Sequence, residues 1–298
     1  MPTISSPVDS TSLFYRDYTP SPLATSYRPS PEAACAVQPL TLVFLHGWPM
    51  SSRMYEHLAL PLCETHRFRV VAPDRRGFGR SEWRAGEGFG WDVLVGDLVG
   101  VLEGAGVGEF VFVASSMGCT ESLLAYQGSE FVRERCKGLI WLGPIMPYPL
   151  QTPTHPLSPS TELWASILDG LRDNRAQFVS EALPGVFAVE AGNEVHPKVL
   201  EHYERIVAEA DGVAIERTTA VFNRESEEEM RRFAAEEVPV LVVHGGSDQS
   251  MPAEGSAVII KEMVPRVELK IYERAGHGLY LTHTDKLMVD LLEFVGKL

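Results

Sequence analysis

A serine at position 116 stands where an apolar run ends in small residues. Residues 110–114 are apolar, Ala114 lies two residues before Ser116, and Gly118 lies two residues after it. The run predicts a buried strand, and the small neighbours are what a tight turn from strand into helix needs. At the apex of such a turn a serine hydroxyl stands above the sheet in a strained backbone conformation. We therefore expect Ser116, rather than the neighbouring Ser115, to be a nucleophile.

An acid and a base for this serine follow later in the chain. Asp248 comes shortly after the apolar run of residues 240–243, and His277 lies between two glycines after the run of residues 267–272. The order serine, acid, histidine is that of a nucleophile elbow followed by its triad partners. The sequence leaves alternatives for both roles: Asp248 as the cap of a helix after Pro252, and His46, His244 or His283 as the base.

Together these side chains predict acyl transfer. A serine hydroxyl is a weak nucleophile at neutral pH, so His277 would accept its proton and later give it to the leaving group. Asp248 would orient the imidazole and stabilise its charged form. Residues 44–49 supply a loop after a strand, and we expect the backbone N–H groups of Trp48 and Met117 to form the oxyanion hole. Each such donor contributes roughly 3 kcal/mol to the transition state.

With these residues in place, the chain resembles the α/β-hydrolase-fold serine esterases, and within them the metal-free haloperoxidase and perhydrolase branch. The resemblance also extends to fungal hydrolases of secondary metabolism, through residues 52–55 and 74–81. It implies an α/β-hydrolase fold, with a mostly parallel sheet of the eight-stranded type, flanking helices and an inserted helical lid. The matching segments are residues 46–49, 74–81, 116–118, 142–144, 277–279 and 282–283.

The chain departs from that family behind the serine and near the N-terminus. The family has glycine at positions where this chain has Ala114, Cys119 and Thr120, and the added side chains narrow the space behind the elbow. A stretch rich in proline and serine, residues 20–37, precedes the first central strand and is predicted to be a surface loop.

The predicted elements place the chemistry on one edge of a sheet. Active-site loops of such sheets lie at the carboxyl ends of the strands, where Trp48, Ser116, Asp248 and His277 all fall. A short strand over residues 13–18 is expected at an antiparallel edge. The buried strands are predicted over residues 40–45, 69–72, 110–114, 138–142, 240–243 and 267–271, with helices over 55–63 and 91–102.

About 90 residues without a clear strand pattern separate the last two predicted strands from the others, which is too long for a plain loop. We expect a helical lid over residues 146–236, between core segments 1–145 and 237–298, with helices over 161–174, 198–210 and 226–235. Packing within the lid is the usual role of aromatic residues at helical spacing. The expected pocket residues are Tyr148, Met146, Trp164 and Leu279.

Composition excludes several classes of partner. With 26 basic and 40 acidic residues the net charge is −14, which argues against nucleic acids and anionic membranes. The four cysteines show no C-x-x-C pair, and no basic segment followed by an apolar stretch opens the chain, so we expect a cytoplasmic protein. The final Gly296-Lys297-Leu298 is a weak match to a peroxisomal signal.

The glycine-rich segments do not indicate a nucleotide site, and the histidines do not indicate a metal. Residues 74–79 lack the third glycine of a dinucleotide fingerprint and the lysine of a P-loop, and residues 104–108 precede a strand instead of following one. The nine histidines form no H-E-x-x-H motif. We expect no cofactor.

The sequence therefore predicts a serine hydrolase that cleaves a carboxylic ester or lactone of a small to medium apolar molecule. Perhydrolysis is an expected side activity from the resemblance. An aspartate at position 116 would have indicated a dehalogenase or an epoxide hydrolase instead. A second hypothesis is a non-hydrolytic protein on the same fold, either a ligand-binding receptor or a biosynthetic cyclase or lyase.

Overall fold

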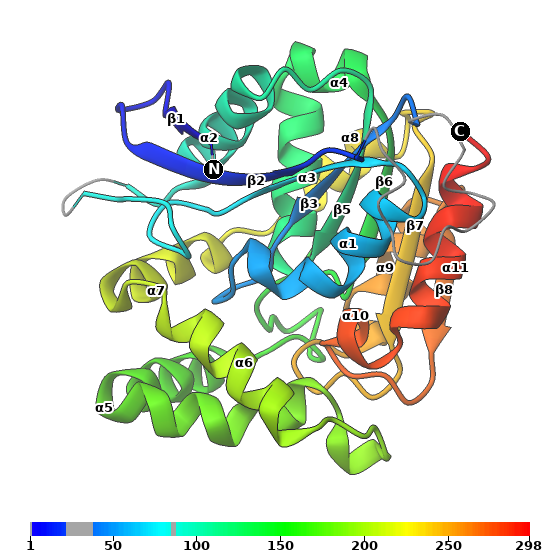
Figure 1. The fold of residues 1–298 in the computed structure, drawn as a ribbon. Coiled ribbons are helices and arrows are strands. Elements are labelled where there is room, and N and C mark those ends of the chain that lie inside the picture. The colour runs from blue at the N-terminus through cyan, green and yellow to red at the C-terminus, as the bar shows by residue number, and fades with distance from the viewer. Residues whose placement is uncertain (1, 22–37, 85–87) are drawn as a thin grey trace.

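Eight strands form one sheet in the computed structural model, which describes residues 2–21, 38–84 and 88–298. Along the sheet the order is β1-β2-β4-β3-β5-β6-β7-β8 (Figure 1). The strands are β1 (Thr3–Ser5), β2 (Ser12–Tyr18), β3 (Thr41–Leu45), β4 (Arg69–Pro73), β5 (Phe110–Ser115), β6 (Cys136–Leu142), β7 (Val240–Gly245) and β8 (Glu268–Tyr272).

The sheet is parallel except at one edge. Strand β2 runs antiparallel to both β1 and β4, whereas every other neighbouring pair from β4 to β8 is parallel. The prediction of a mostly parallel sheet with an antiparallel edge is confirmed. Strand β1 was not predicted, because three residues, two of them exposed, give too short a pattern to recognise.

Helices cover both faces of the sheet, because alternate residues of each buried strand point to opposite sides. Leu42 and Phe44 of β3 pack in a core with α1 and α11. Val43 and Leu45 pack in a second core with α2, α3, α8 and α9. The helices that flank the sheet are α1 (Glu56–Glu64), α2 (Trp91–Gly104), α3 (Met117–Gly128), α4 (Glu130–Arg135), α8 (Glu227–Phe233), α9 (Ala257–Met263), α10 (Leu279–Thr282) and α11 (Thr284–Val295).

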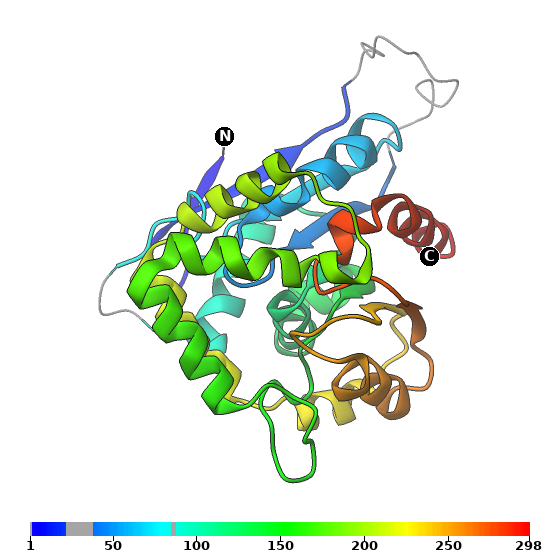
Figure 2. The same cartoon turned by 90° about the horizontal axis from the view of Figure 1, so that it is seen from below.

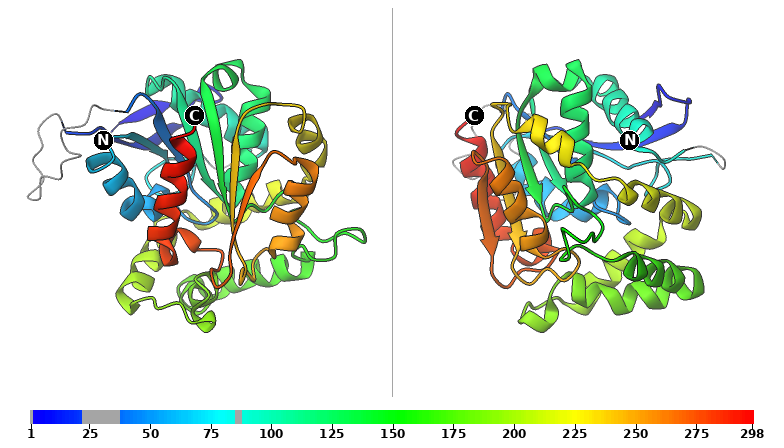
Figure 3. Two further views of the ribbon diagram at one scale, coloured as in Figure 1. Left: turned by 90° about the vertical axis from the view of Figure 1, so that its right-hand side faces the viewer. Right: turned by 180° about the vertical axis from the view of Figure 1, so that it is seen from behind.

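Three further helices between β6 and β7 lie at one end of the sheet (Figure 1). They are α5 (Thr161–Val186), α6 (Pro197–Ala208) and α7 (Gly212–Thr218). Helices α5 and α6 are at the bottom of Figure 1 and of both views in Figure 3, and α7 lies above them in Figure 1. Figure 2, seen from below, shows α5 and α6 in front of the sheet. Asn174 has non-helical backbone angles and kinks α5 at the residue where the sequence predicted the helix to end.

Helix α8 differs from the expectation that it would belong with these three. Its Met230 and Phe233 are buried in the second core, on the face of the sheet that α2 and α3 cover. The Phe233 ring lies 5.6 Å from that of Trp141 and 5.7 Å from that of Tyr126. An amphipathic pattern indicates that a helix buries one face, but it does not indicate which element that face packs against. The buried face of α8 packs against α3.

Most of the surface loop expected over residues 20–37, namely residues 22–37, lies outside the described residues. Within the described ranges, no helix combines the length and the apolar character needed to cross a bilayer.

Candidate active site

Ser116 lies at the junction of β5 and α3 in a conformation that side chains rarely adopt. Its φ is 55° and its ψ is −120°, and α3 begins at the next residue, Met117. A hydrogen bond of 2.9 Å from its N–H to the carbonyl oxygen of Leu142 holds the turn against β6. Backbone strain of this kind persists only where the surroundings enforce it, and it is typical of functional sites.

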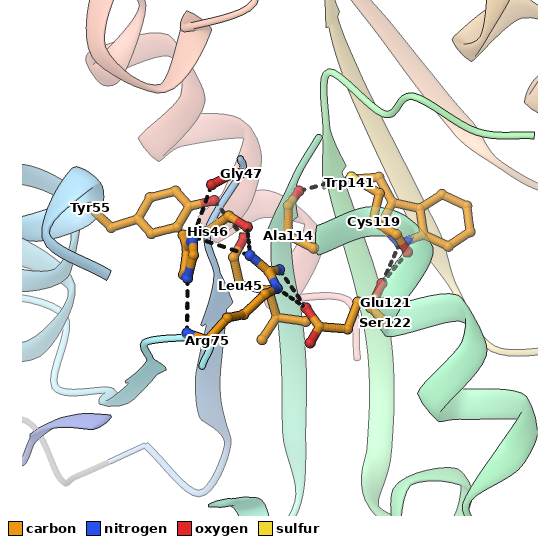
Figure 4. Close-up of polar contacts among 10 residues, drawn as sticks. All are labelled: Leu45, His46, Gly47, Tyr55, Arg75, Ala114, Cys119, Glu121, Ser122 and Trp141. Carbon is orange, nitrogen blue, oxygen red and sulfur yellow. Dashed lines mark hydrogen bonds and ion pairs between the residues drawn. The ribbon is translucent and has the colours of Figure 1, made fainter. Parts of the chain in front are cut away.

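The departures from the family glycines fill the space behind this turn. Cys119 is fully buried, and its thiol donates to the carbonyl oxygen of Ala114 over 3.2 Å. Ser122 accepts a hydrogen bond of 2.9 Å from the Trp141 indole N–H and donates one of 2.7 Å to the carbonyl oxygen of Cys119. Figure 4 shows these contacts on the side of β5 that faces α3. Cys119 is thus a packing residue, which agrees with its raised thiol pKa, caused by burial.

Asp248 and His277 come together from two loops. The Nδ1 of His277 lies 2.7 Å from Oδ2 of Asp248. The other carboxylate oxygen, Oδ1, accepts the backbone N–H groups of Ser250 (2.8 Å) and Met251 (3.0 Å). These bonds form a turn and leave Oδ2 for the imidazole, so Asp248 does not cap the short 3-10 helix that follows Pro252.

The electrostatics of this pair follow from its burial. Burial disfavours the charged form of each group, but the two stabilise each other. The pKa of His277 is raised above its usual 6.5, because the charge and hydrogen bond of Asp248 outweigh burial. The pKa of the Asp248 carboxyl lies well below its usual range, because His277 and His244 outweigh the opposing effect of burial. Asp248 is therefore ionised whenever His277 titrates.

Glycines around His277 allow close packing of its loop. A Cβ at Gly143, whose φ is +53°, would lie 3.3 Å from Nδ1 of His277. Cβ atoms at Gly276 and Gly278 would lie 2.6 Å from the Val186 carbonyl oxygen and 2.3 Å from the Phe187 ring. Larger residues at these positions would displace the imidazole from the site.

Ser116 and His277 line one cavity of about 330 Å³. Within the described part of the chain the Ser116 hydroxyl forms no hydrogen bond with His277 or another residue. In enzymes without substrate this bond is often long and shortens only in the complex. The structure thus joins Asp248 to His277 directly and brings Ser116 to the same cavity.

The expected oxyanion-hole donors come from the loop after β3 and from the start of α3. A Cβ on Gly47 would lie 3.3 Å from Cβ of Ser116, so the loop passes directly over the serine. The N–H groups of Trp48 and Met117 donate to no acceptor among residues 2–21, 38–84 and 88–298. Trp48 lines the cavity, and neither N–H is committed to another described acceptor, as the expected role requires.

The cavity is apolar, and two parts of its wall come from different elements. The cavity floor comprises Gly47, Trp48, Ser115, Ser116, Ile145 and His277, on the loops at the strand ends. The cavity roof comprises Leu163, Trp164, Ile167, Leu171, Phe178, Val179 and Leu183, all on α5. No aspartate, glutamate, lysine or arginine occurs among the described residues of the wall. Such a cavity suits an uncharged substrate.

Aromatic rings connect the cavity floor to the cavity roof. The ring of Trp48 lies 5.5 Å from that of Trp164, which stacks on Phe222 at 4.6 Å. The Trp48 indole N–H donates a hydrogen bond of 2.9 Å to the carbonyl oxygen of Ile215 in α7. Flat rings at this end of the cavity favour a planar or aromatic group in the ligand.

Of the four expected pocket residues, only Trp164 lies on the cavity wall. Met146 is buried in the core on the α3 side of the sheet, and Leu279 is buried in the core on the α1 side. The Tyr148 ring stacks on His155 with centroids 3.3 Å apart. These three were expected in the pocket because they follow strand ends or the histidine, but their side chains point into packed regions instead.

The competing histidines do not line the cavity. His244 is fully buried beside Asp248, and its Nε2 lies 2.8 Å from the Met251 carbonyl oxygen. His283 lies against Tyr272, with rings 5.6 Å apart. His46 is buried in a network behind the cavity floor. Only His277 among these four lines the cavity.

Sequence reasoning missed several residues of the wall. Gln249 and Ser250 reach the cavity from the Asp248 loop, and Met50 and Met54 reach it from the segment after Trp48. Nearness in sequence to the expected acid or oxyanion loop was the one signal that could have identified them, since a loop that places one side chain in a site usually places its neighbours there too.

Comparisons with known proteins agree with this architecture. The sequence profile of the alpha/beta hydrolase fold matches residues 41–284. A non-heme haloperoxidase of Rhodococcus erythropolis and a bifunctional esterase/perhydrolase of Acinetobacter calcoaceticus are each 28% identical to this chain, over 96% of it and 97% of their own length. An esterase structure from Exiguobacterium antarcticum superposes with a TM-score of 0.83 at 21% identity, covering 99% of this chain and 98% of that one.

Proposed function

The chain belongs to the alpha/beta hydrolase fold family, and from this membership we propose that it is a serine hydrolase that cleaves a carboxylic ester or lactone of a small to medium apolar molecule. One observation carries the proposal: His277 lines the same apolar cavity as Ser116, and its Nδ1 is hydrogen-bonded to Asp248 over 2.7 Å. One sequence relative of the chain is described as a bifunctional esterase/perhydrolase, and one protein of similar structure is described as an esterase.

The proposed reaction runs in two halves. Nε2 of His277 accepts the Ser116 proton as Oγ attacks the acyl carbon, and the carbonyl electrons move onto oxygen, where the N–H groups of Trp48 and Met117 stabilise the charge. The intermediate collapses, the bond to the alkoxy group breaks, and the imidazolium gives its proton to that group. Water then attacks the acyl-enzyme with the same proton transfers, which releases the acid and restores Ser116.

The lining of the cavity favours a substrate whose acyl and alcohol groups are uncharged. A charged group would lose its hydration without finding an opposite charge, since the described wall residues include no cation or carboxylate. The aromatic rings of Trp48, Trp164 and Phe222 favour substrates with a flat apolar portion. The proposed ligand is therefore a neutral ester or lactone.

Perhydrolysis is the proposed side activity. Hydrogen peroxide would replace water in the second half-reaction and leave with the acyl group as a peracid. One relative is described as a bifunctional esterase/perhydrolase and another as a non-heme haloperoxidase. A cytoplasmic location and a place in fungal secondary metabolism stay predictions from the sequence.

A serine-directed phosphonate tests the proposal. We expect the wild type to hydrolyse short p-nitrophenyl esters and to be inactivated by the phosphonate, with the label on Ser116 when its peptides are analysed by mass spectrometry. Ser116→Ala should lose at least about 10⁴-fold in kcat and resist labelling. A label on Ser115, or full activity of Ser116→Ala, would contradict the assignment.

The same experiment addresses the second hypothesis. A ligand-binding receptor, or a cyclase or lyase that does not transfer acyl groups, would show neither ester turnover nor labelling of Ser116 by the phosphonate. The proposed acyl transfer would then be wrong, although the fold would stand.

A further inference from the structure

A buried ion pair lies directly behind the cavity floor. Arg75 follows β4, and Glu121 lies in the second turn of α3; their side chains are 5% and 3% exposed. Strands β4, β3 and β5 are neighbours in that order, so the pair crosses behind the end of β3. Figure 4 shows the Arg75 side chain between the end of β3 and α3.

The guanidinium contacts both elements that carry the expected oxyanion-hole donors, α3 and the loop after β3. Its Nε and Nη2 donate to Oε2 of Glu121, over 2.7 Å for Nε. Its Nη1 donates to the carbonyl oxygen of His46. The planar guanidinium can hold these directions at once, which an ammonium group cannot. Arg75 therefore links α3, which begins at Met117, to the loop that carries Trp48.

The His46 ring completes the link. Its Nε2 accepts the backbone N–H of Arg75 over 3.1 Å, so we assign the ring proton to Nδ1, which donates to the Gly47 carbonyl oxygen over 2.9 Å. Burial and the charge of Arg75 hold the pKa of His46 well below its usual value, so the ring is neutral. Both sides of this imidazole thus fix backbone atoms, those of Arg75 and Gly47.

Close packing leaves the two donor segments no freedom to shift independently. A Cβ on Gly118 would lie 2.7 Å from the Leu45 carbonyl oxygen and 3.2 Å from Nη2 of Arg75. The Tyr55 hydroxyl donates to that carbonyl oxygen over 3.0 Å from the opposite side (Figure 4). The distance between the loop after β3 and the first turn of α3 is therefore set by this group of contacts.

We propose that Arg75 is a positioning residue for the oxyanion hole: anchored by Glu121, its guanidinium holds the His46 carbonyl and so sets the spacing between the N–H groups of Trp48 and Met117. The proposal rests on the serine hydrolase function proposed above. Arg75 touches neither substrate nor reacting atoms. It acts on the transition state, because the two donors are fully engaged only when the carbonyl oxygen becomes an oxyanion.

The next residue offers a matched control for a merely structural role. Arg76 is also fully buried and donates to the carboxylate of Asp97 over 2.6 Å and 2.9 Å, and to Asp9 over 2.6 Å. Asp97 belongs to α2, away from the cavity wall. Arg76→Lys therefore disturbs an equally buried arginine pair without touching either oxyanion-hole donor.

The test compares Arg75→Lys, Glu121→Gln and Arg76→Lys in the full chain. We expect Arg75→Lys to lower kcat for p-nitrophenyl butyrate by roughly tenfold to a hundredfold with KM nearly unchanged. Binding of a trifluoromethyl ketone, which forms a tetrahedral adduct with the serine, should weaken by a similar factor. Glu121→Gln should act in the same direction with a smaller effect. Arg76→Lys should lower the unfolding temperature and leave kcat per folded molecule unchanged.

A double variant keeps the test valid if Arg75→Lys does not fold. Arg75→Met combined with Glu121→Leu removes both charges, and replacement of a buried pair by apolar residues of similar size is often tolerated. Its unfolding temperature should stay near that of the wild type, while kcat falls as in Arg75→Lys. Unchanged kcat and ketone affinity in a folded Arg75 variant would overturn the positioning role.

The two proposals fail in different ways. If the wild type has no esterase activity, or if Ser116→Ala keeps it, the proposed function fails. If the wild type depends on Ser116 and the Arg75 variants nevertheless match Arg76→Lys in every measurement, only the positioning role fails.

Discussion

The cavity floor and the cavity roof are held in place by different kinds of contact. Behind and beside the cavity floor lie buried polar bonds, such as Asp248 to His277 and Arg75 to Glu121. The cavity roof is tied by apolar contacts and by exposed ion pairs such as Arg172 to Glu216, whose side chains are 55% and 45% exposed. Buried polar bonds fix geometry, whereas exposed pairs contribute little.

This difference assigns separate tasks to the two parts. The cavity floor carries the groups that must stay within tenths of an ångström of the reacting atoms. The cavity roof, on α5 with its kink at Asn174, offers shape and apolar surface that can vary without disturbing them. We therefore expect changes in the cavity floor to alter kcat and changes in the cavity roof to alter substrate preference.

The largest expected effect is on Asp248, the acid that holds His277 of the cavity floor. Asp248→Asn should lower kcat roughly 10⁴-fold at neutral pH, because an amide stabilises neither the needed tautomer nor the imidazolium. Steady-state kinetics with p-nitrophenyl butyrate measure this. Asp290→Asn serves as the control, since Asp290 is a buried carboxylate hydrogen-bonded to Tyr272 and lies outside the cavity wall. Equal losses in the two variants would contradict the assignment.

The next largest effect is on pH dependence. His277 must be neutral to accept the serine proton, so kcat/KM should rise with pH and be lost as pH falls through its pKa. Asp248 raises that pKa above 6.5, so the midpoint should lie above 6.5, with about a tenfold loss for each pH unit below it. A profile measured with a non-titrating ester checks this. A flat profile from pH 5 to 8 would argue against His277 as the base.

A smaller effect is expected in the cavity roof. Trp164→Ala should lower kcat/KM roughly tenfold, about 1.4 kcal/mol, for esters that carry an aromatic group, and it should do so through KM. For aliphatic acetate esters kcat/KM should stay near the wild-type value. Trp83→Ala is the matched control, because Trp83 packs on Phe89 away from the cavity wall. Equal losses for aryl and acetate esters would show that Trp164 does not select the substrate.

The smallest effect is expected at the exposed tie between α5 and α7. Arg172→Ala removes the pair with Glu216 and should leave kcat and KM unchanged, with a shift in unfolding temperature below about 2 °C. Differential scanning calorimetry and ester kinetics check this. A large loss of either activity or stability would mean that the cavity roof depends on its surface charges.

Most of the fold could be predicted from the sequence, because its central strands are buried and form continuous apolar runs. Strands β3, β5, β6 and β7 lie within a residue or two of the predicted ranges. The short strand β1 could not be predicted, since three residues, two of them exposed, give no recognisable pattern. The packing of α8 against α3 could not be predicted either, since an amphipathic pattern does not specify the partner of a helix.

The candidate site shows the same division. The sequence could indicate Ser116, Asp248 and His277, because each follows a recognisable strand end and their order along the chain is the serine, acid, histidine order of this fold. The pocket residues Met146, Tyr148 and Leu279 were predicted from nearness to strand ends, but nearness in sequence does not fix the direction of a side chain. The Arg75 to Glu121 pair joins residues 46 positions apart, which only the order of β4, β3 and β5 brings together.

The central claim is that Ser116 carries the acyl group during turnover. Rapid acid quench of the enzyme with p-nitrophenyl butyrate, followed by mass spectrometry of the intact chain and its peptides, tests this directly. The account predicts a butyryl adduct on Ser116 that forms faster than it hydrolyses and is absent from Ser116→Ala. Steady ester turnover with no adduct on Ser116, or with the adduct on another residue, would contradict it.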